Sequence, residues 1–447
     1  FSALANVRLF GANMGLLGGM KYLAGFALEQ WKSPDELARL QESRLKNAFK
    51  EASRTRYYRD LLRQSDLRST GAFSVLESLP TTSKEHIQSN PDAFIQDGHD
   101  GKGIISRETT GSTGKPLKVR MDKKASTIRT ALMLLNMMSC GLTPFSLTAD
   151  LCFSDGVRRP LSGRAYGVLP WFSLDILDDE KKNLEIMRKC RADSLGYYPS
   201  AMTLLARANM DSQKPLRLKQ VLSGAEMLVP GWRKLLEDSF CCPVFNLYGS
   251  WEFGPMAWEC PEEHSLHVNT GSFHMEILDS RNRPLSHGTG RVVITSLCNG
   301  AMPLLRYEME DLAGWGGQCP CGRGLPVLKS LEGRSDDMVV LPSGRLRSPR
   351  SVRFTDLECV VKGIRTYQLI QEKEDLFLFR YVPSSAGFPE SSRKEIARRI
   401  SIACLGEQVR VEFEQVEEIA RNRGGKLDQL ISKVSRRRSI LDGGEPS

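Results

Sequence analysis

The chain has 447 residues, of which 40% are hydrophobic and 26% charged, and a formal net charge of +9 at pH 7. Its length exceeds the size at which one core stops growing, so we expect two domains, and its ordinary composition excludes a disordered or fibrous chain. The charge does not indicate nucleic-acid binding, because basic residues are dispersed and cluster only at residues 436–438. Eleven scattered cysteines without a framework of spacings indicate the reduced thiols of a cytoplasmic protein.

The first 75 residues are predicted to be helical. Residues 9–28 are the most apolar stretch, but Lys21 and the glycines at positions 11, 15, 18 and 19 interrupt it, so it fits neither a transmembrane span nor a signal peptide. We expect a helix packed on the main domain, with a membrane-surface helix as the alternative. A further helix is predicted to begin at Pro34, because Asp35 and Glu36 occupy its first turn and apolar residues recur through Phe49.

Residues 195–258 alternate between short apolar runs and helical patterns. Residues 218–222 and 244–248 are predicted strands, and residues 230–240 are a predicted helix between them. This alternation favours an α/β fold whose strands are buried on both faces. Beyond Gly271 the apolar residues recur with period two, which predicts a smaller β region with half-buried strands at residues 274–278 and 291–295.

Polar residues near positions 333–337 predict a boundary between two domains, residues 1–333 and residues 334–447. The second segment contains predicted strands at residues 339–341, 365–371 and 376–382, a helix at residues 389–404 and a closing strand at residues 409–416. About 110 residues is a reasonable size for an independent α+β domain. The sequence therefore predicts a large α/β domain hinged to a small, mobile α+β domain.

A glycine-rich loop follows the predicted N-terminal helices. Its glycines allow the backbone to approach a phosphate closely, its hydroxyl groups add neutral donors, and its lysine adds a cation. It is not a Walker A loop, because a threonine replaces the first glycine and Pro116 replaces the hydroxyl residue that binds magnesium. The sequence predicts a phosphate-binding loop formed by Thr109, Thr110, Gly111, Ser112, Thr113, Gly114 and Lys115.

This loop resembles the phosphate-binding signature of the acyl-adenylate-forming superfamily, which includes acyl-CoA synthetases, peptide-synthetase adenylation domains and luciferases. Residues 248–255, 320–323 and 333–338 look like the phenylacetate–coenzyme A ligase branch, and the stretch from Leu341 looks more like its capsule-biosynthesis (CapK-type) relatives. Five further tracts match the superfamily in its order, and the last match is Gly424-Gly425-Lys426. The others are Ser223-Gly224-Ala225-Glu226, Tyr248-Gly249-Ser250-Trp251-Glu252, residues 303–307 with Asp311, and the hinge at residues 333–337.

The resemblance implies ATP-dependent activation of a carboxylic acid to acyl-AMP, with release of pyrophosphate. The acyl group is then transferred to a thiol, for which coenzyme A is the first candidate. Lys115 and the loop amides would hold the β- and γ-phosphates, and Glu252 would coordinate Mg²⁺. Lys426 would bind the attacking carboxylate and the α-phosphate, and Asp336 would be the hinge residue. The adenine, ribose and phosphate contacts implied beyond the loop are Ser223, Gly224, Ala225, Glu226, Tyr248, Gly249, Ser250, Asp311 and Arg334.

Two departures from the family pattern concern the ribose-binding segment and the acyl acceptor. Glu308 and Glu310 precede Asp311 where relatives usually have arginine and threonine, and residues 340–345 replace a strand that normally forms part of the pantetheine tunnel. An amine, a hydroxyl or a carrier-protein thiol is therefore the alternative acceptor. A nucleotide-binding or basic interaction protein without ligase activity is a second alternative, which the intact Lys115 and Lys426 oppose.

Two further sites are predicted from side-chain chemistry. Aromatic residues that could form an acid pocket favour an aromatic or alkyl acid, although core packing explains them equally well. Three cysteines and a histidine form a candidate structural zinc site, Cys260, His267, Cys319 and Cys321, in which His264 could replace His267. The candidate pocket residues are Trp171, Phe172, Tyr197, Tyr198 and Met227.

Overall fold

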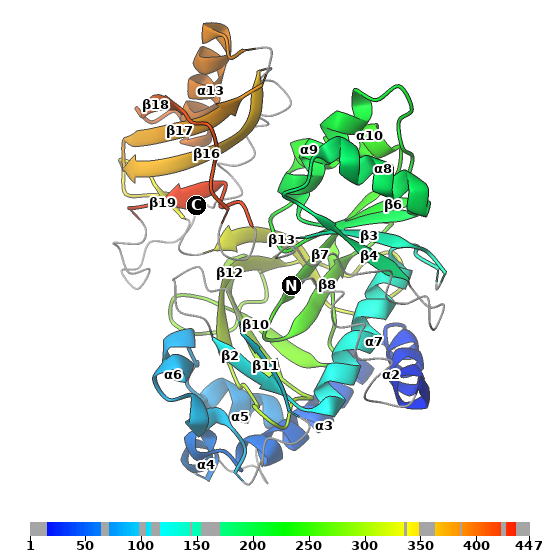
Figure 1. Cartoon of the computed structure of the whole chain (residues 1–447). Coiled ribbons are helices and arrows are strands. Elements are labelled where there is room, and N and C mark those ends of the chain that lie inside the picture. Colours follow the sequence, from blue (N-terminus) through cyan, green and yellow to red (C-terminus); the bar gives the residue numbers. More distant parts are fainter. Residues whose placement is uncertain are drawn as a thin grey trace.

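The fold is taken from a computed structural model, which describes residues 16–63, 71–97, 104–108, 117–143, 145–152, 170–334, 338–347, 363–384, 387–421 and 426–434. Figure 1 shows a large body that contains the main sheet and, beside it, a smaller body formed by the C-terminal strands and α13. The predicted mixed α/β class is confirmed.

The described residues of the N-terminal segment, 16–63 and 71–75, are mainly helical, as predicted. The helix predicted to begin at Pro34 is confirmed, and a capping box in which Ser33 and Glu36 bond each other's backbone N–H fixes its start. Its buried face, which includes Leu45 and Phe49, joins the core beneath one half of the main sheet. The elements are α2 (Leu16–Glu29), α3 (Pro34–Ala52), α4 (Arg56–Arg63), α5 (Ala72–Ser78), α6 (Lys84–Ser89) and the 3₁₀ helix η2 (Pro91–Phe94).

One 11-stranded sheet runs through the large body in the order β10-β11-β12-β13-β9-β8-β7-β6-β5-β3-β4. Strands β4, β3, β5, β6 and β7 are parallel, and the other neighbours are antiparallel. The predicted strands at residues 218–222 and 244–248 correspond to β6 and β7. The parallel strands are β3 (Thr148–Cys152), β4 (Trp171–Asp175), β5 (Ser194–Tyr197), β6 (Gln220–Gly224) and β7 (Val244–Ser250).

Helices cover both faces of the parallel strands, which is why these strands read as continuous apolar runs. On one face, Ala149 and Leu151 of β3 pack with residues of α8, α9 and α10 in one core cluster. On the other face, α7 packs with Trp171, Leu222 and Phe245. The helices are α7 (Lys123–Ser139), α8 (Glu180–Cys190), α9 (Pro199–Met210) and α10 (Pro230–Phe240), the last with the predicted bounds.

The predicted β region is part of the same sheet and is not a separate unit. Its strands were expected to be half-buried, but β10 and β11 are almost entirely buried, because α3 and α5 pack against them. The hairpin of β1 and β2 brackets the glycine-rich loop, with Glu108 opposite Lys118. These strands are β1 (Ile105–Glu108), β2 (Lys118–Met121), β8 (Gly254–Glu259), β9 (Leu266–Val268), β10 (Phe273–Leu278), β11 (Thr289–Ser296), β12 (Tyr307–Trp315) and β13 (Val327–Arg334).

The C-terminal segment forms its own four-stranded sheet in the order β18-β17-β16-β19 and its own core around Phe377, Phe379 and Ile400. Every predicted element is found, but the strand expected to close the domain is an edge strand, and β19 adds a last strand beside β16. The elements are β14 (Val339–Val340), β15 (Leu346–Arg347), β16 (Ile364–Lys373), β17 (Leu376–Pro383), α13 (Glu390–Ala403), β18 (Arg410–Gln415) and β19 (Leu430–Ser432).

None of the helices in the described part of the chain combines the length and the apolar character that a bilayer span requires.

Candidate functional site

A cavity of about 110 Å³ opens where the parallel strands β5, β6 and β7 end. Ligands of open α/β sheets bind in the crevice outside the carboxyl ends of the strands, so this is the expected place for a site. Of the residues predicted for the nucleotide, the acid and catalysis, eight line this one cavity: Tyr197, Tyr198, Gly224, Ala225, Tyr248, Gly249, Ser250 and Lys426.

Among the described residues that line this cavity, Lys426 belongs to the C-terminal domain. Beside it, the backbone N–H of Leu427 donates to the Glu226 carboxylate at 2.8 Å, and Arg421 approaches the same carboxylate at 3.9 Å. Glu226 also accepts hydrogen bonds from the backbone N–H and hydroxyl of Ser200, both at 3.1 Å. Thus Glu226, predicted to lie against adenine, connects the two domains next to the cavity.

Tyr248 and Asp311, predicted for adenine and ribose, are brought together from β7 and β12. The Tyr248 hydroxyl donates to Oδ2 of Asp311 at 2.7 Å. Asp311 also lies opposite Arg334 in the β12–β13 register. A carboxylate held by the phenol of a cavity residue is oriented to accept further hydrogen bonds from vicinal hydroxyls.

Glu252, predicted to bind Mg²⁺, lies on the turn between β7 and β8, next to Tyr307. Burial, with the charge of Glu252 and their shared hydrogen bond, raises the pKa of Tyr307 above its usual value. Glu308, one of the residues that depart from the family pattern, is half-buried and forms an ion pair with Arg291 at 2.6 Å, so this carboxylate has a cationic partner on β11.

Two non-glycine residues that line the cavity have positive φ angles, Tyr197 at 123° and Ala225 at 66°. Such backbone conformations are costly for L-residues and are concentrated at functional sites. Both residues lie where a parallel strand ends, Tyr197 as the last residue of β5 and Ala225 directly after β6.

Other predicted residues lie elsewhere. Trp171 of β4 is 1% exposed and packs against α7, Phe172 belongs to the core beneath α8–α10, and neither lines the cavity. Ser223 is fully buried in β6, and Met227 is half-buried beyond it. The phosphate loop from Thr109 to Pro116, with Lys115, lies outside the described residues, as do Asp336, Gly424, Gly425 and the side chain of Arg334.

Sequence reasoning missed the part of the cavity formed by α7 and β3. Positions 129, 133, 136 and 137 have the spacing of one helix face, but two of these residues are polar, and the sequence does not show that this face is buried. The missed residues are Arg129, Met133, Asn136, Met137, Thr148 and Asp150.

The predicted metal ligands meet in one cluster. One ligand atom from each of Cys260, His267, Cys319 and Cys321 lies within 4.8 Å of the other three. The Cys260 and Cys319 sulfur atoms are 3.6 Å apart, and the Cys321 sulfur is 3.3 Å from Nε2 of His267. His264 does not join them, because its Nδ1 is 2.7 Å from the Glu259 carboxylate.

The surroundings of the cluster determine the protonation state of its histidine and hold the Cys319–Cys321 turn in place. Burial, with the nearby charge of Arg323, lowers the pKa of His267 to about 4, so its imidazole is neutral at pH 7. Arg323 lies 4.5 Å from the ring centre of Trp31 and 5.0 Å from that of Trp258, and its Nε donates to Gln30 at 3.0 Å. The Cys319–Cys321 turn is thereby attached to the end of α2.

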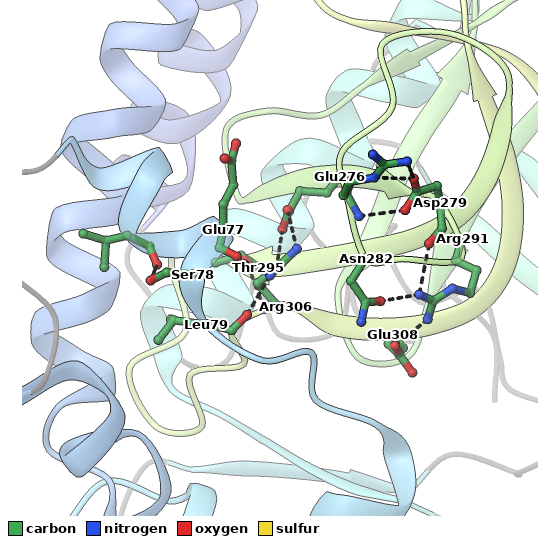
Figure 2. A network of polar contacts seen from close by, with 12 residues as sticks. Glu77, Ser78, Leu79, Glu276, Asp279, Asn282, Arg291, Thr295, Arg306 and Glu308 are labelled. Atoms are coloured by element: carbon green, nitrogen blue, oxygen red, sulfur yellow. Dashed lines mark hydrogen bonds and ion pairs between the residues drawn. The ribbon is translucent and has the colours of Figure 1, made fainter. Parts of the chain in front are cut away.

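A buried ion pair supports the strand that contains Asp311. Arg306 donates to the Glu276 carboxylate at 3.1 Å and to the carbonyl groups of Glu77 and Leu79 at 2.8 and 2.6 Å. Figure 2 shows Arg306 directed at these acceptors from β10 and from the end of α5. The guanidinium therefore connects the N-terminal helices to the start of β12.

Comparison with known proteins gives three findings. Residues 350–433 match the family described as the CapK C-terminal domain. A phenylacetate-coenzyme A ligase of Thermus thermophilus is 28% identical over 76% of this chain and 79% of its own length, and protein CapK of Staphylococcus aureus is 21% identical over 91% and 92%. The crystal structure of 2-hydroxyisobutyryl-CoA ligase in the postadenylation state, with a bound acyl-AMP, covers 92% of both chains at 19% identity with a TM-score of 0.74.

The chain therefore has the fold of the adenylate-forming ligases. Within that class, its relatives are phenylacetate–coenzyme A ligases and CapK, which confirms the resemblance predicted from the sequence.

Proposed function

We propose that this protein is an ATP-dependent ligase that activates a carboxylic acid as acyl-AMP, releases pyrophosphate and transfers the acyl group to coenzyme A. The observation that supports this most directly is the meeting of Tyr248, the strand-end loop at Gly224–Ala225 and the C-terminal Lys426 at one cavity. A homologous ligase and a structurally similar one bear names that describe this chemistry.

In this proposal adenine lies against the Gly224–Ala225 backbone and Tyr248, and Asp311 accepts hydrogen bonds from the ribose hydroxyls. The Tyr248–Asp311 hydrogen bond of 2.7 Å supports this, because it fixes the carboxylate before ATP binds. Residues 109–115 would hold the β- and γ-phosphates, and Glu252 would bind the Mg²⁺ that neutralises their charge.

Adenylation requires the carboxylate to attack the α-phosphate through a strongly anionic transition state, so the enzyme contributes mainly positioning and positive charge. Lys426 would supply that charge. The Leu427 N–H bond to Glu226 supports this role, because it holds the chain beside Lys426 against the large domain. For acyl transfer, rotation about a hinge at Asp336 would withdraw Lys426 and open a path for the thiol.

Coenzyme A is the proposed acceptor because the relatives with assigned activity are coenzyme A ligases. An amine, hydroxyl or carrier-protein acceptor is the second candidate, favoured by the CapK-type match of residues 350–433. We also propose a cytoplasmic location, because the cysteines of the described residues are all free thiols.

A pyrophosphate-release screen tests this function. ATP, Mg²⁺ and a panel of carboxylic acids are supplied with coenzyme A, with hydroxylamine as a small amine, or with no acceptor. Acid-dependent pyrophosphate release, with a thioester formed only when coenzyme A is present, is the expected result. Release that coenzyme A leaves unchanged would favour the second candidate, and ATP binding without release for any acid would contradict both.

We further propose that Cys260, His267, Cys319 and Cys321 hold a structural Zn²⁺. Tetrahedral zinc with bonds of about 2.3 Å to sulfur keeps two sulfur ligands roughly 3.8 Å apart, and the 3.6 Å between Cys260 and Cys319 fits this geometry. Three thiolates and one imidazole would complete the coordination, so the ion would stabilise the fold and would not take part in catalysis.

A further inference from the structure

The inner end of the cavity contains polar side chains that the proposed adenylation does not use. Asn136 of α7 and Thr148 of β3 both line the cavity and are each 1% exposed. Among the described residues, neither the amide nitrogen nor the amide oxygen of Asn136 has a hydrogen-bond partner, and neither does the hydroxyl of Thr148. Buried polar groups are nearly always hydrogen-bonded, so these atoms require a partner that enters the cavity.

Strand register places these groups away from the nucleotide end. Tyr197 lies opposite Leu151, while Thr148 lies opposite Ser194, three residues earlier in both strands. At about 3.3 Å per residue, Thr148 lies roughly 10 Å further along the strands than Tyr197. Adenine is proposed at the strand ends, so Asn136 and Thr148 face the part of the acid that is remote from its carboxylate.

A third polar residue faces the same space. Ala149 and Leu151 belong to the core beneath α8–α10, so Thr148 and Asp150 of the same strand point to the other face, toward α7. Asp150 is fully buried and lines the cavity. When ionised, its carboxylate offers only acceptor oxygens, so this set of side chains favours a hydrogen-bond donor.

We propose that the substrate is a carboxylic acid that bears a hydrogen-bond-donating substituent, an amino or hydroxyl group, at the end remote from its carboxylate. Met133, Met137 and Leu222 provide apolar walls for the carbon skeleton between the two ends. Asn136, Thr148 and Asp150 bind the substituent. This inference rests on the proposed function and defines its substrate class.

Matched acids test the proposal. Pyrophosphate release is measured for phenylacetates substituted at the meta or para position, and for short alkanoates substituted at the far end, with amino, aminomethyl, hydroxyl or methyl groups. A site built to hydrogen-bond a substrate group rejects the analogue without it by about 100-fold or more in kcat/KM. We expect that preference for a donor-substituted acid over its methyl isostere. The aminomethyl acids show whether the carboxylate of Asp150 selects a cation.

Two variants test whether Asn136 and Thr148 cause the preference for a donor-substituted acid. Asn136→Leu and Thr148→Val conserve volume and should each lower the ratio of kcat/KM for the donor-substituted acid over its methyl isostere by about 10-fold or more, since one polar contact is removed. Met133→Leu changes an apolar wall and should leave that ratio unchanged. The ratio compares two substrates on the same protein, so it does not depend on the folded fraction.

Contrary outcomes separate the two proposals. Equal use of methyl- and donor-substituted acids by the native enzyme would overturn the inference while the proposed function stands. An unchanged ratio in both variants would also overturn it. Absence of pyrophosphate release with every acid would overturn the proposed function and the inference with it.

Discussion

Replacing Arg306 by methionine removes the cation from a pair with almost no access to solvent. The Arg306 and Glu276 side chains are 3% and 5% exposed, and the guanidinium also satisfies the carbonyl groups of Glu77 and Leu79. Removing one partner of a buried ion pair costs about 3–5 kcal/mol, because the other charge stays buried without compensation. Near the melting temperature, unfolding entropy is about 2.1 cal/mol/K per residue, or roughly 0.7 kcal/mol/K for about 330 residues. The melting temperature of the large domain should therefore fall by about 4–7 °C.

The loss should depend on pH in a defined direction. Burial raises the pKa of Glu276, and Arg306 opposes that rise. Without Arg306 the folded-state pKa rises further above the unfolded value, so the folded protein binds the extra proton. A carboxyl group of this kind stabilises the fold below its unfolded pKa and loses that contribution as pH rises through its folded pKa. The difference in melting temperature between native and variant protein should be larger at pH 8 than at pH 5.

Differential scanning calorimetry at both pH values tests this reasoning. Glu276→Gln in the Arg306→Met background should recover part of the loss at pH 8 and remove its pH dependence. Arg283→Met is the matched control, because the Arg283 side chain is 69% exposed and its ion pair with Asp279 should contribute little. An Arg306→Met protein that melts with the native protein at pH 8, or that loses more stability at pH 5, would refute the argument.

Three further results are expected. Elemental analysis should find about one zinc per chain. Cys319→Ser should lose the metal and lower the melting temperature. Native protein that is as stable without zinc as with it would contradict this site. Lys426→Ala should lower ATP–pyrophosphate exchange by about 100-fold but still transfer acyl groups from preformed acyl-AMP. Lys115→Ala should lower exchange and also weaken ATP binding. Equal loss of adenylation and acyl transfer in Lys426→Ala would exclude the proposed rotation of the C-terminal domain between the two steps. Tyr248→Phe frees the Asp311 carboxylate and should raise the KM for ATP without changing the KM for the acid, so equal changes in both would refute the ribose assignment.

Local signals in the sequence predicted the fold's elements well. The acidic first turn after Pro34 located α3, and the apolar run at residues 244–248 located β7, because both features are set by neighbours in the chain. Local signals could not show that one sheet continues from β4 to β10. Pairings such as β9 with β13 join segments about 60 residues apart, and period two reports only that alternate side chains differ in polarity.

In the metal cluster, too, the sequence predicted the candidate residues, and the strand pairing decided which of them meet. Cysteine and histidine content suggested Cys260, His267, Cys319 and Cys321 as ligands, but the sequence left His264 as a possible replacement for His267. The β9–β13 register decides between them, since it places His267 opposite Val327, close to the turn that bears Cys319 and Cys321. His264 has a positive φ of 54° at the turn before β9, and its side chain is directed at Glu259.

The sequence predicted the candidate active-site residues that lie in motifs and missed those whose position depends on packing between distant segments. Motif order identified Tyr248 and Lys426, because each lies in a glycine-containing tract that resembles one of the superfamily. Asn136 carries no motif, and a polar residue on a helix usually indicates a solvent-exposed face. Its burial follows only from α7 packing across the parallel strands opposite Thr148 and Asp150. In this fold the motifs specify the common chemistry with ATP, while the residues that distinguish one acid from another depend on how a helix and a strand without motifs face each other.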